Sequence, residues 1–244
     1  MTGMWIRYGN AAEPTAVVLP GSGSTAEFVA RAFAGPVRAA GYALVTADPP
    51  DAAGDPADAW AEALDALPSR PAVAGGVSLG AHAVARWAAQ RPGGADGLLL
   101  VMPAWTGAAD GVAAVSGATA DELDADGPEA VLARLRAIPA GDAAWVVAEL
   151  DRAWRHRGRM TLVAELRGVA ASPGPTDDEL ARIDVPAGLV ALRDDPLHPE
   201  AVARHWRSVL PDAALETVGH ASVAADRAAL GGAALRALAA IGSR

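Results

Sequence analysis

A serine flanked by small residues is the strongest chemical signal in this sequence. The segment Gly76-Val77-Ser78-Leu79-Gly80 follows an apolar run typical of a buried strand and precedes a helical pattern over residues 79–90. A serine on a sharp turn between a strand and a helix holds its hydroxyl above the sheet, and glycines two positions away leave room for that turn. The bare pattern can arise by chance in a Gly- and Ala-rich chain, so its strand-turn-helix setting is what predicts that Ser78 is a nucleophile.

A serine nucleophile needs a base and a third group that holds the base. Asp194 and Asp195 follow an apolar run over residues 187–192, and His220 follows another run over residues 214–218. The acid and the histidine therefore stand where the C-terminal ends of parallel strands are expected, which is where such sheets hold their sites. The chain order serine, acid, histidine indicates nucleophilic catalysis, with Asp194 and Asp195 competing for the acid role.

The other histidines are interpreted as capping or surface residues. They are His82, His156, His198 and His205. No two histidines have the H-x-x-x-H or H-x-H spacing of a metal site, so no metal is predicted. The predicted chemistry needs no organic cofactor.

Short apolar runs alternate with Ala-rich helical stretches along most of the chain. This alternation predicts an α/β fold with a doubly wound, mostly parallel sheet of about six to eight strands and helices on both faces. Residues 4–8 are expected to add an antiparallel edge strand. The predicted strands cover residues 16–19, 42–47, 73–77, 97–102, 187–192 and 214–218, and the predicted helices cover residues 26–39, 57–67, 79–90, 200–209 and 222–240.

The alternation stops between residues 103 and 184, where no strong strand run appears. An unstructured loop of this length is uncommon in a compact domain, so the segment is expected to fold as a helical cap or lid over the site. We therefore expect an α/β core over residues 1–103 and 184–244, with the cap inserted over residues 104–183. The helical pieces predicted in the cap cover residues 129–138, 143–156 and 160–170.

Four segments together resemble the α/β-hydrolase superfamily, in the small single-domain form with a helical cap. They are Leu19-Pro20-Gly21-Ser22-Gly23, the elbow around Ser78, Asp195-Pro196-Leu197-His198-Pro199 and Gly219-His220. The resemblance covers nearly the whole chain. It implies a catalytic triad of Ser78, Asp195 and His220. Asp195 is preferred to Asp194 because the Pro-x-x-Pro stretch after it matches the acid loop of the family.

A serine hydrolase also needs two backbone N–H groups aimed at the developing oxyanion. The N–H of Leu79 is the first candidate. The second is expected from Gly21-Ser22-Gly23, where Ser22 holds the matching position and Gly23 is the adjacent alternative. The same segment can be an ordinary turn into a helix capped by Ser24 or Thr25, and the two interpretations are compatible.

Two features of the cap bear on the substrate without fixing it. Trp105, Trp145 and Trp154 can line an apolar pocket beneath the cap, although tryptophans at helical spacing more often serve packing alone. Between residues 131 and 168, seven arginines stand against four acids, a local charge of +3 in a chain of net charge −9. This basic segment can steer an anionic substrate, but a solvated helix face with ion pairs is the more frequent arrangement.

Composition excludes several other functions. The 244 residues include no Cys and no Lys, which leaves out thiolate nucleophiles, Schiff-base chemistry and Lys-dependent phosphate loops. The net charge of −9 argues against nucleic acid as a partner. No signal-peptide run and no stretch long enough for a bilayer appears, so a cytoplasmic protein without membrane contact is expected. A monomer and a homodimer both stay open.

The combined expectation is a serine hydrolase that cleaves a small-molecule carboxylic ester, thioester or lactone through an acyl-enzyme. Acyl transfer or cyclisation by the same triad is one alternative, because the fold is shared by many chemistries. A protein of the same fold that binds a small apolar ligand without cleaving it is the other alternative.

Overall fold

The computed structural model of the chain describes residues 5–50, 54–109 and 111–242, which form a seven-stranded sheet of order β1-β3-β2-β4-β5-β6-β7. β1 pairs antiparallel with β3, and the other neighbouring strands are parallel. The predicted mostly parallel sheet with an antiparallel edge strand is confirmed, although Met4 of that predicted strand lies outside the described residues. The strands are β1 (Ile6–Tyr8), β2 (Thr15–Leu19), β3 (Ala43–Thr46), β4 (Val73–Val77), β5 (Gly97–Val101), β6 (Ala187–Leu192) and β7 (Ala213–Val218).

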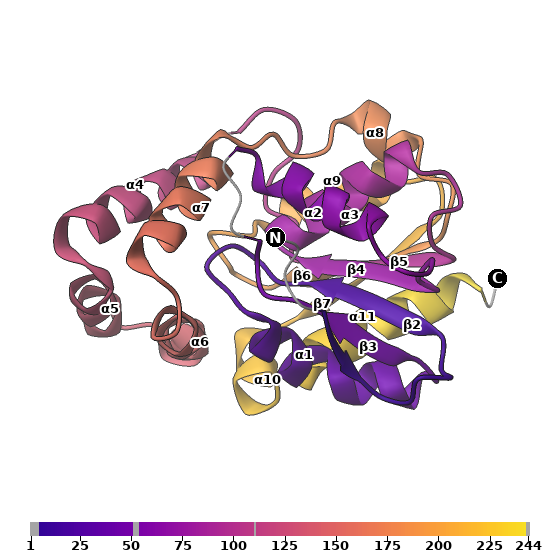
Figure 1. Ribbon diagram of the computed structural model, residues 1–244, viewed down its shortest axis with the longest axis horizontal. Helices are drawn as coiled ribbons and strands as arrows, with labels where there is room; N and C mark the ends of the chain where they lie inside the picture. Colours follow the sequence, from indigo (N-terminus) through magenta and orange to yellow (C-terminus); the bar gives the residue numbers. More distant parts are fainter. Residues whose placement is uncertain (1–4, 51–53, 110, 243–244) are drawn as a thin grey trace.

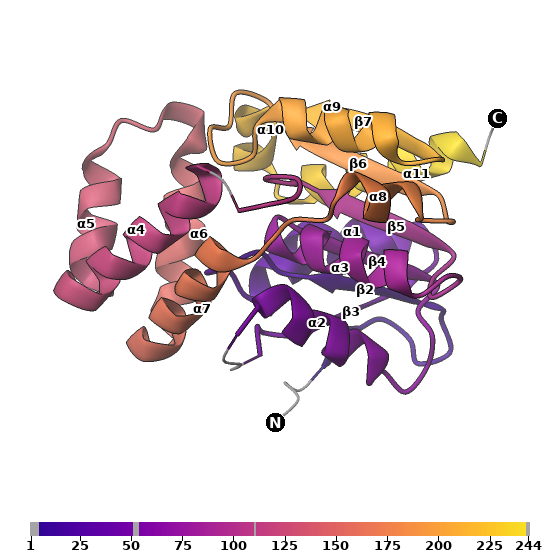
Figure 2. The same cartoon turned by 90° about the horizontal axis from the view of Figure 1, so that it is seen from above.

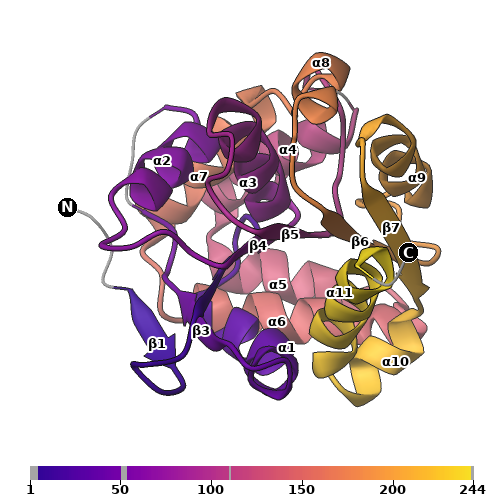
Figure 3. The same cartoon turned by 90° about the vertical axis from the view of Figure 1, so that its right-hand side faces the viewer.

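Helices cover both faces of the sheet (Figure 3). β4, β5 and β6 are buried at every residue. Strands covered on both faces are continuous apolar runs, because neither side of the strand meets water. One face is covered by α1 (Ala26–Ala39) and α11 (Ala228–Ile241), and the other by α2 (Pro56–Asp65), α3 (Leu79–Gln90) and α9 (Glu200–Val209).

Each face of the sheet has its own apolar core. Phe33 and Leu230 belong to the core beneath α1 and α11, whereas Trp60 and Trp206 belong to the core beneath α2, α3 and α9. β4 and β5 end at paired residues, as do β6 and β7, and β6 extends two residues beyond the end of β5. The loops that follow these strands therefore emerge at the same edge of the sheet, where such folds place their sites.

A helical insertion lies between β5 and β6 in the chain and stands beside the sheet in space (Figures 1 and 2). Leu123, Leu132, Trp154 and Leu162 form a third apolar core inside it. The last helix of the insertion, α8, packs against α3 and α9 and not into this third core. The insertion consists of α4 (Gly111–Asp126), α5 (Pro128–Ala137), the short 3-10 turn η1 (Gly141–Ala143), α6 (Ala144–Trp154), α7 (Arg159–Ala171) and α8 (Asp177–Ala181).

Two helices differ from the sequence-based expectation. α4 was not predicted, because its sequence is rich in Ala, Gly, Ser and Thr and carries no continuous apolar stripe. The single helix expected over residues 222–240 is two helices, α10 (His220–Ala225) and α11. The break lies at Asp226, whose backbone is extended at φ −150° and whose carboxylate accepts the N–H of Ala228 at 2.9 Å. This local bond between side chain and backbone turns the chain where the sequence pattern predicted one continuous helix.

Candidate active site

Ser78 occupies a strained turn between β4 and α3. Its backbone has φ 54° and ψ −116°, a conformation that a residue with a side chain rarely adopts. The Ser78 N–H donates to the carbonyl oxygen of Val101 at 2.8 Å, and its own carbonyl accepts the N–H groups of Ala81 and His82. These backbone bonds to the neighbouring strand and to the first turn of α3 hold the serine in the strained position.

The glycines on either side of Ser78 are required by close backbone packing. A Cβ atom on Gly76 would lie 2.1 Å from the carbonyl carbon of Gly80, and a Cβ atom on Gly80 would lie 2.6 Å from the carbonyl oxygen of Leu19. Both distances are far below van der Waals contact, and the obstacle is backbone in each case. The glycine spacing in the sequence therefore reflects how tightly α3 approaches β4 and the loop after β2.

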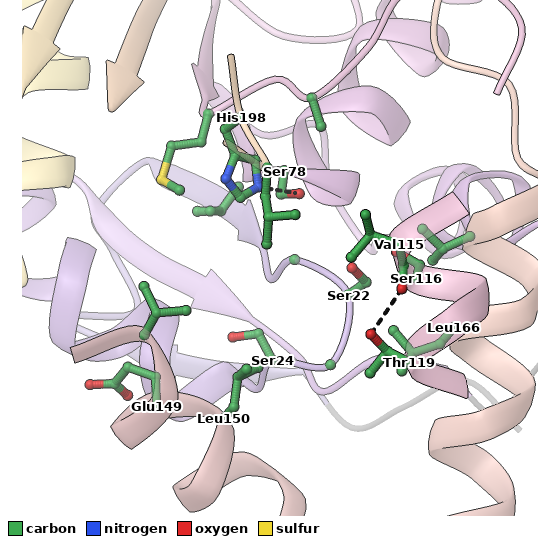
Figure 4. Close-up of a pocket in the computed structure, with 18 of the residues that line it drawn as sticks. Ser22, Ser24, Ser78, Val115, Ser116, Thr119, Glu149, Leu150, Leu166 and His198 are labelled. Carbon is green, nitrogen blue, oxygen red and sulfur yellow. Dashed lines mark hydrogen bonds between the residues drawn. The ribbon is translucent and has the colours of Figure 1, made fainter. Parts of the chain in front are cut away.

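His198 is the imidazole that contacts Ser78. Its Nε2 lies 2.9 Å from Ser78 Oγ, as Figure 4 shows, and its Nδ1 lies 3.4 Å from Oδ1 of Asp195. The interpretation of His198 as a capping or surface histidine differs from this arrangement, because its side chain is only 16% exposed and faces the serine. The three-residue spacing between Asp195 and His198, in a loop at the C-terminal end of β6, is the signal that could have identified it.

His220 lies on the other side of the same carboxylate. Its Nε2 is 3.7 Å from Oδ2 of Asp195, and its Nδ1 accepts the indole N–H of Trp145 at 3.2 Å. The structure thus brings Asp195 together with His220, and Ser78 together with His198. In the described part of the chain, no hydrogen bond joins His220 to Ser78.

The carboxylate of Asp195 lies between the two histidines. Its Oδ1 accepts the backbone N–H groups of Leu197 at 2.8 Å and of His198 at 3.1 Å. Burial alone would raise the pKa of Asp195, but hydrogen bonds from the His198 ring and from these two amides, together with the charge of His198, outweigh it and lower the pKa. The neighbouring Asp194 is exposed, with a left-handed backbone at φ 57°.

The loop after β2 lies against Ser78. A Cβ atom on Gly21 would be 3.3 Å from the Cβ atom of Ser78. Gly21 to Ser24 form a turn closed by the Ser24 N–H on the Gly21 carbonyl at 3.1 Å, with Gly23 at φ +68°, as a type II turn requires. The Gly23 N–H donates to Oε1 of Glu165 at 3.1 Å and is not available to a substrate. Of Ser22 and Gly23, only Ser22 therefore remains a candidate for the second backbone N–H that would face the oxyanion.

The N–H of Leu79 is the other candidate for the oxyanion. Leu79 is the first residue of α3, and the N–H groups in the first turn of a helix have no partner within that helix. The same end of the helix carries the positive end of its dipole, which favours negative charge beside Ser78.

An apolar cavity of about 270 Å³ lies beside Ser78 and His198 (Figure 4). Its walls come from the loop after β2, from the ends of β4 and β5, and from α4, α6 and α7 of the insertion. The three tryptophans named from the sequence, Trp105, Trp145 and Trp154, all contribute to this lining. Among the described residues that line the cavity, His198 is present and His220 is not.

The arginines of the insertion are ion-paired. Each of the seven between residues 131 and 168 has a carboxylate within 4 Å, and four of the partner acids belong to α4, which ends just before the counted segment. The local charge of +3 is therefore balanced by neighbouring acids. The pairs are Arg134 with Glu122 and Asp126, Arg136 and Arg155 with Asp151, Arg152 with Glu27, Arg157 with Glu165, Arg159 with Asp124, and Arg167 with Asp121 and Asp124.

The remaining histidines lie away from the serine hydroxyl. His156 and His205 are exposed, as predicted. His82 is not a surface residue: its side chain is completely buried under the elbow, and its Nε2 accepts the backbone N–H of Ala104 at 3.0 Å. Burial, and then the nearby charges of His198 and Arg86, lower the pKa of His82 to about 3, so the ring is neutral.

The described residues contain no group of three or more His, Asp or Glu side chains placed to hold a metal ion. None of the helices in the described ranges is long and apolar enough to cross a membrane.

Comparisons with known proteins find this architecture among solved structures. MenH from S. aureus has a TM-score of 0.73 at 16% identity, covering 99% of this chain and 100% of its own. The enol-lactonase from Burkholderia xenovorans LB400 has a TM-score of 0.71 at 17% identity over 90% of each chain. A thermophilic esterase from Thermogutta terrifontis has a TM-score of 0.71 at 15% identity, covering 96% of this chain and 91% of its own. No family model and no curated protein sequence matches the chain.

Proposed function

We propose that the chain, which has the α/β-hydrolase fold, is a serine hydrolase that cleaves carboxylic esters, thioesters or lactones through an acyl-enzyme. The observation that carries the proposal is the 2.9 Å contact between Ser78 Oγ and an imidazole nitrogen, on a strained turn beside an apolar cavity. A hydroxyl in this position can give its proton to the imidazole as its oxygen attacks a carbonyl carbon.

The reaction proceeds in two halves. In the first, Ser78 Oγ bonds to the carbonyl carbon, the hydroxyl proton passes to the imidazole, and the leaving group takes that proton as its bond to the carbonyl carbon breaks. In the second, water gives a proton to the same imidazole and attacks the acyl-enzyme, which releases the acid and restores the Ser78 hydroxyl. Asp195 stays ionised and orients the imidazole throughout.

The oxyanion of each tetrahedral intermediate is assigned to two backbone N–H groups, those of Leu79 and Ser22. Such donors act in a site from which water is excluded, and the loss of one typically lowers kcat about 10²–10³-fold. The close approach of the loop after β2 to Ser78 supports this assignment.

The cavity favours an apolar acyl group of small to medium size. Aromatic and aliphatic side chains dominate its walls. Glu149 also lines it, but the Glu149 carboxylate is bonded to Arg31 and Arg227 and is not free to bind a cationic substrate. The likeness to an enol-lactonase and an esterase agrees with an ester or lactone as the cleaved group.

Intact-mass measurement after reaction with a fluorophosphonate tests the proposal. The wild type should gain one adduct, Ser78→Ala should gain none, and Ser208→Ala should behave as the wild type because Ser208 is exposed on α9. A panel of p-nitrophenyl esters of increasing chain length then measures the acyl size that the cavity admits. An unmodified wild type contradicts the proposal and favours a protein that binds a small ligand without cleaving it.

A further inference from the structure

We propose that His198, rather than His220, is the general base for Ser78, and that His220 is a positioning residue for Asp195. This inference rests on the proposed serine hydrolase function and identifies which imidazole acts as the general base in that reaction. The assignment places the acid and the base in one loop after β6, three residues apart, instead of in loops after two different strands.

The contacts of His198 give its two ring nitrogens the acceptor and donor roles that a base needs. The Ser78 hydroxyl can only be activated if it donates its hydrogen to an unprotonated ring nitrogen, and His198 Nε2 lies 2.9 Å from its oxygen. The ring proton then sits on Nδ1, which faces Asp195 Oδ1 at 3.4 Å. Oxygen, imidazole and carboxylate thus follow one another in the order that serine catalysis requires.

Each ring nitrogen of His220 faces a group other than Ser78. The indole N–H of Trp145 can only donate, so His220 Nδ1 must accept, and in the neutral ring the proton is then on Nε2. That Nε2 faces Asp195 Oδ2 at 3.7 Å. A neutral His220 in this arrangement has no lone pair left with which to take the proton of Ser78.

Trp145 holds His220 in this orientation because the indole is itself fixed. Its ring stacks on Phe28 with 6.2 Å between ring centroids and an interplanar angle of 8°. The guanidinium of Arg227 lies 5.0 Å from the Trp145 ring centroid and bonds to Glu149 of α6. The insertion therefore packs over His220 through Trp145, which is only 8% exposed.

Access to the substrate separates the two histidines further. The base must also hand its proton to the leaving group, so it must face the space in which the substrate binds. Among the described residues that line the cavity, Ser78 and His198 are present, and His220 is not.

The loop itself explains how acid and base keep their relative position. Asp195 Oδ1 accepts the backbone N–H groups of Leu197 and His198, so the carboxylate is tied to the same short segment that carries the imidazole. His220 contacts the other oxygen of Asp195 and restrains it from the opposite side. In acylation, the proton of Ser78 moves to His198 Nε2 as the Oγ–C bond forms, and then to the leaving group, while His220 keeps its contacts with Trp145 and Asp195.

Glutamine variants distinguish the two histidines. In His220→Gln, the amide oxygen can accept from Trp145 and the amide nitrogen can donate to Asp195, so both contacts of a positioning residue survive. In His198→Gln, the amide can still contact Ser78 but cannot take its proton. We expect kcat/KM for a p-nitrophenyl ester to fall roughly 10²–10⁴-fold in His198→Gln and less than about tenfold in His220→Gln.

The pH profile provides a readout that a structural role would not move. The acid limb of kcat/KM that reports the base should persist in His220→Gln and disappear in His198→Gln. A loss in His220→Gln that equals or exceeds the loss in His198→Gln overturns the assignment, as does retention of the acid limb in His198→Gln.

Added imidazole gives a second measurement that does not depend on the glutamine variants. His198→Ala opens space at the cavity wall, so free imidazole should restore part of its activity, and no restoration is expected in His220→Ala. Rescue of His220→Ala alone contradicts the assignment. Failure of the proposed function itself is recognised separately, because the wild type would then form no fluorophosphonate adduct at Ser78 whichever histidine is present.

Discussion

The two halves of the candidate site are built in different ways. On one side, the elbow at Ser78 and the loop after β2 are held by backbone hydrogen bonds and by glycines that allow backbones to touch. On the other side, two backbone N–H groups fix the carboxylate of Asp195, and its contacts with the two histidines are made by side chains from the loop after β6, from α10 and from α6. The elbow is a local structure set by neighbouring residues, whereas the histidine side depends on how distant segments pack.

This difference determines what each side tolerates. Backbone contact leaves no room for even one methyl group, so the elbow is sensitive to size. A side-chain cluster can exchange one partner for another that offers the same donors and acceptors, so the histidine side is sensitive to chemical identity. Substitutions on the two sides separate these two kinds of sensitivity.

The largest effect is expected from a methyl group at the elbow. Gly76→Ala places a Cβ atom 2.1 Å from the Gly80 carbonyl carbon, and the backbone of α3 must shift away from β4. We expect the free energy of unfolding, measured with urea, to fall by more than about 3 kcal/mol. Gly232→Ala in α11 is the matched control, because its Cβ atom would meet only the flexible end of Arg236. Equal stability of the two variants would contradict this description of the elbow.

On the histidine side, the loss of one charge should lower activity and leave the fold intact. Asp195→Asn keeps the shape of the acid but cannot stabilise an imidazolium, so kcat should fall by about 10²–10⁴-fold. Asp194→Asn is the control, because Asp194 is exposed and asparagine suits its left-handed backbone. A larger loss of kcat in Asp194→Asn would assign the acid role to the other aspartate.

A smaller effect is expected in the pH dependence of folding stability, through His82, which is buried beneath the elbow. His82 is neutral in the folded protein because burial lowers its pKa to about 3, whereas its ordinary value is 6.5. The unfolded chain binds the extra proton between these values, so folding stability falls as pH drops below 6.5, by up to about 1.4 kcal/mol per pH unit.

Urea unfolding between pH 6.5 and 4.5 measures this loss. His82→Gln keeps an acceptor for the Ala104 N–H and does not titrate, so its stability should change less over the same window. The carboxyl groups of Asp55 and Asp195, whose pKa values are lowered, add their own loss only at lower pH. An unchanged pH dependence in His82→Gln would show that the buried ring does not cause the loss of folding stability.

The same contrast explains what the sequence could predict. The sheet, its edge strand, the helices on both faces and the insertion follow from apolar periodicity and from the turn residues between elements. α4 was not predicted because its small residues form no apolar stripe, and the break at Asp226 depends on a single hydrogen bond between a side chain and the backbone. Neither feature has a periodic signal.

Within the candidate site, the elbow could be identified from local spacing, since the constraint on Gly76 and Gly80 comes from residues within a few positions of Ser78 and from one neighbouring loop. Local spacing places His198 in the same loop as Asp195, but it does not decide between His198 and His220 as the partner of Ser78. Whether His198 or His220 faces the serine depends on Trp145, which belongs to the insertion and lies 75 residues from His220 in the chain. No local pattern records that contact.

The most direct test of the central claim is to locate the fluorophosphonate adduct by peptide mapping in the wild type and in His198→Gln. A single adduct is expected on the peptide that contains Ser78, formed rapidly in the wild type and at least about a hundredfold more slowly in His198→Gln. An adduct on another residue, or equal rates in the two proteins, would contradict the claim.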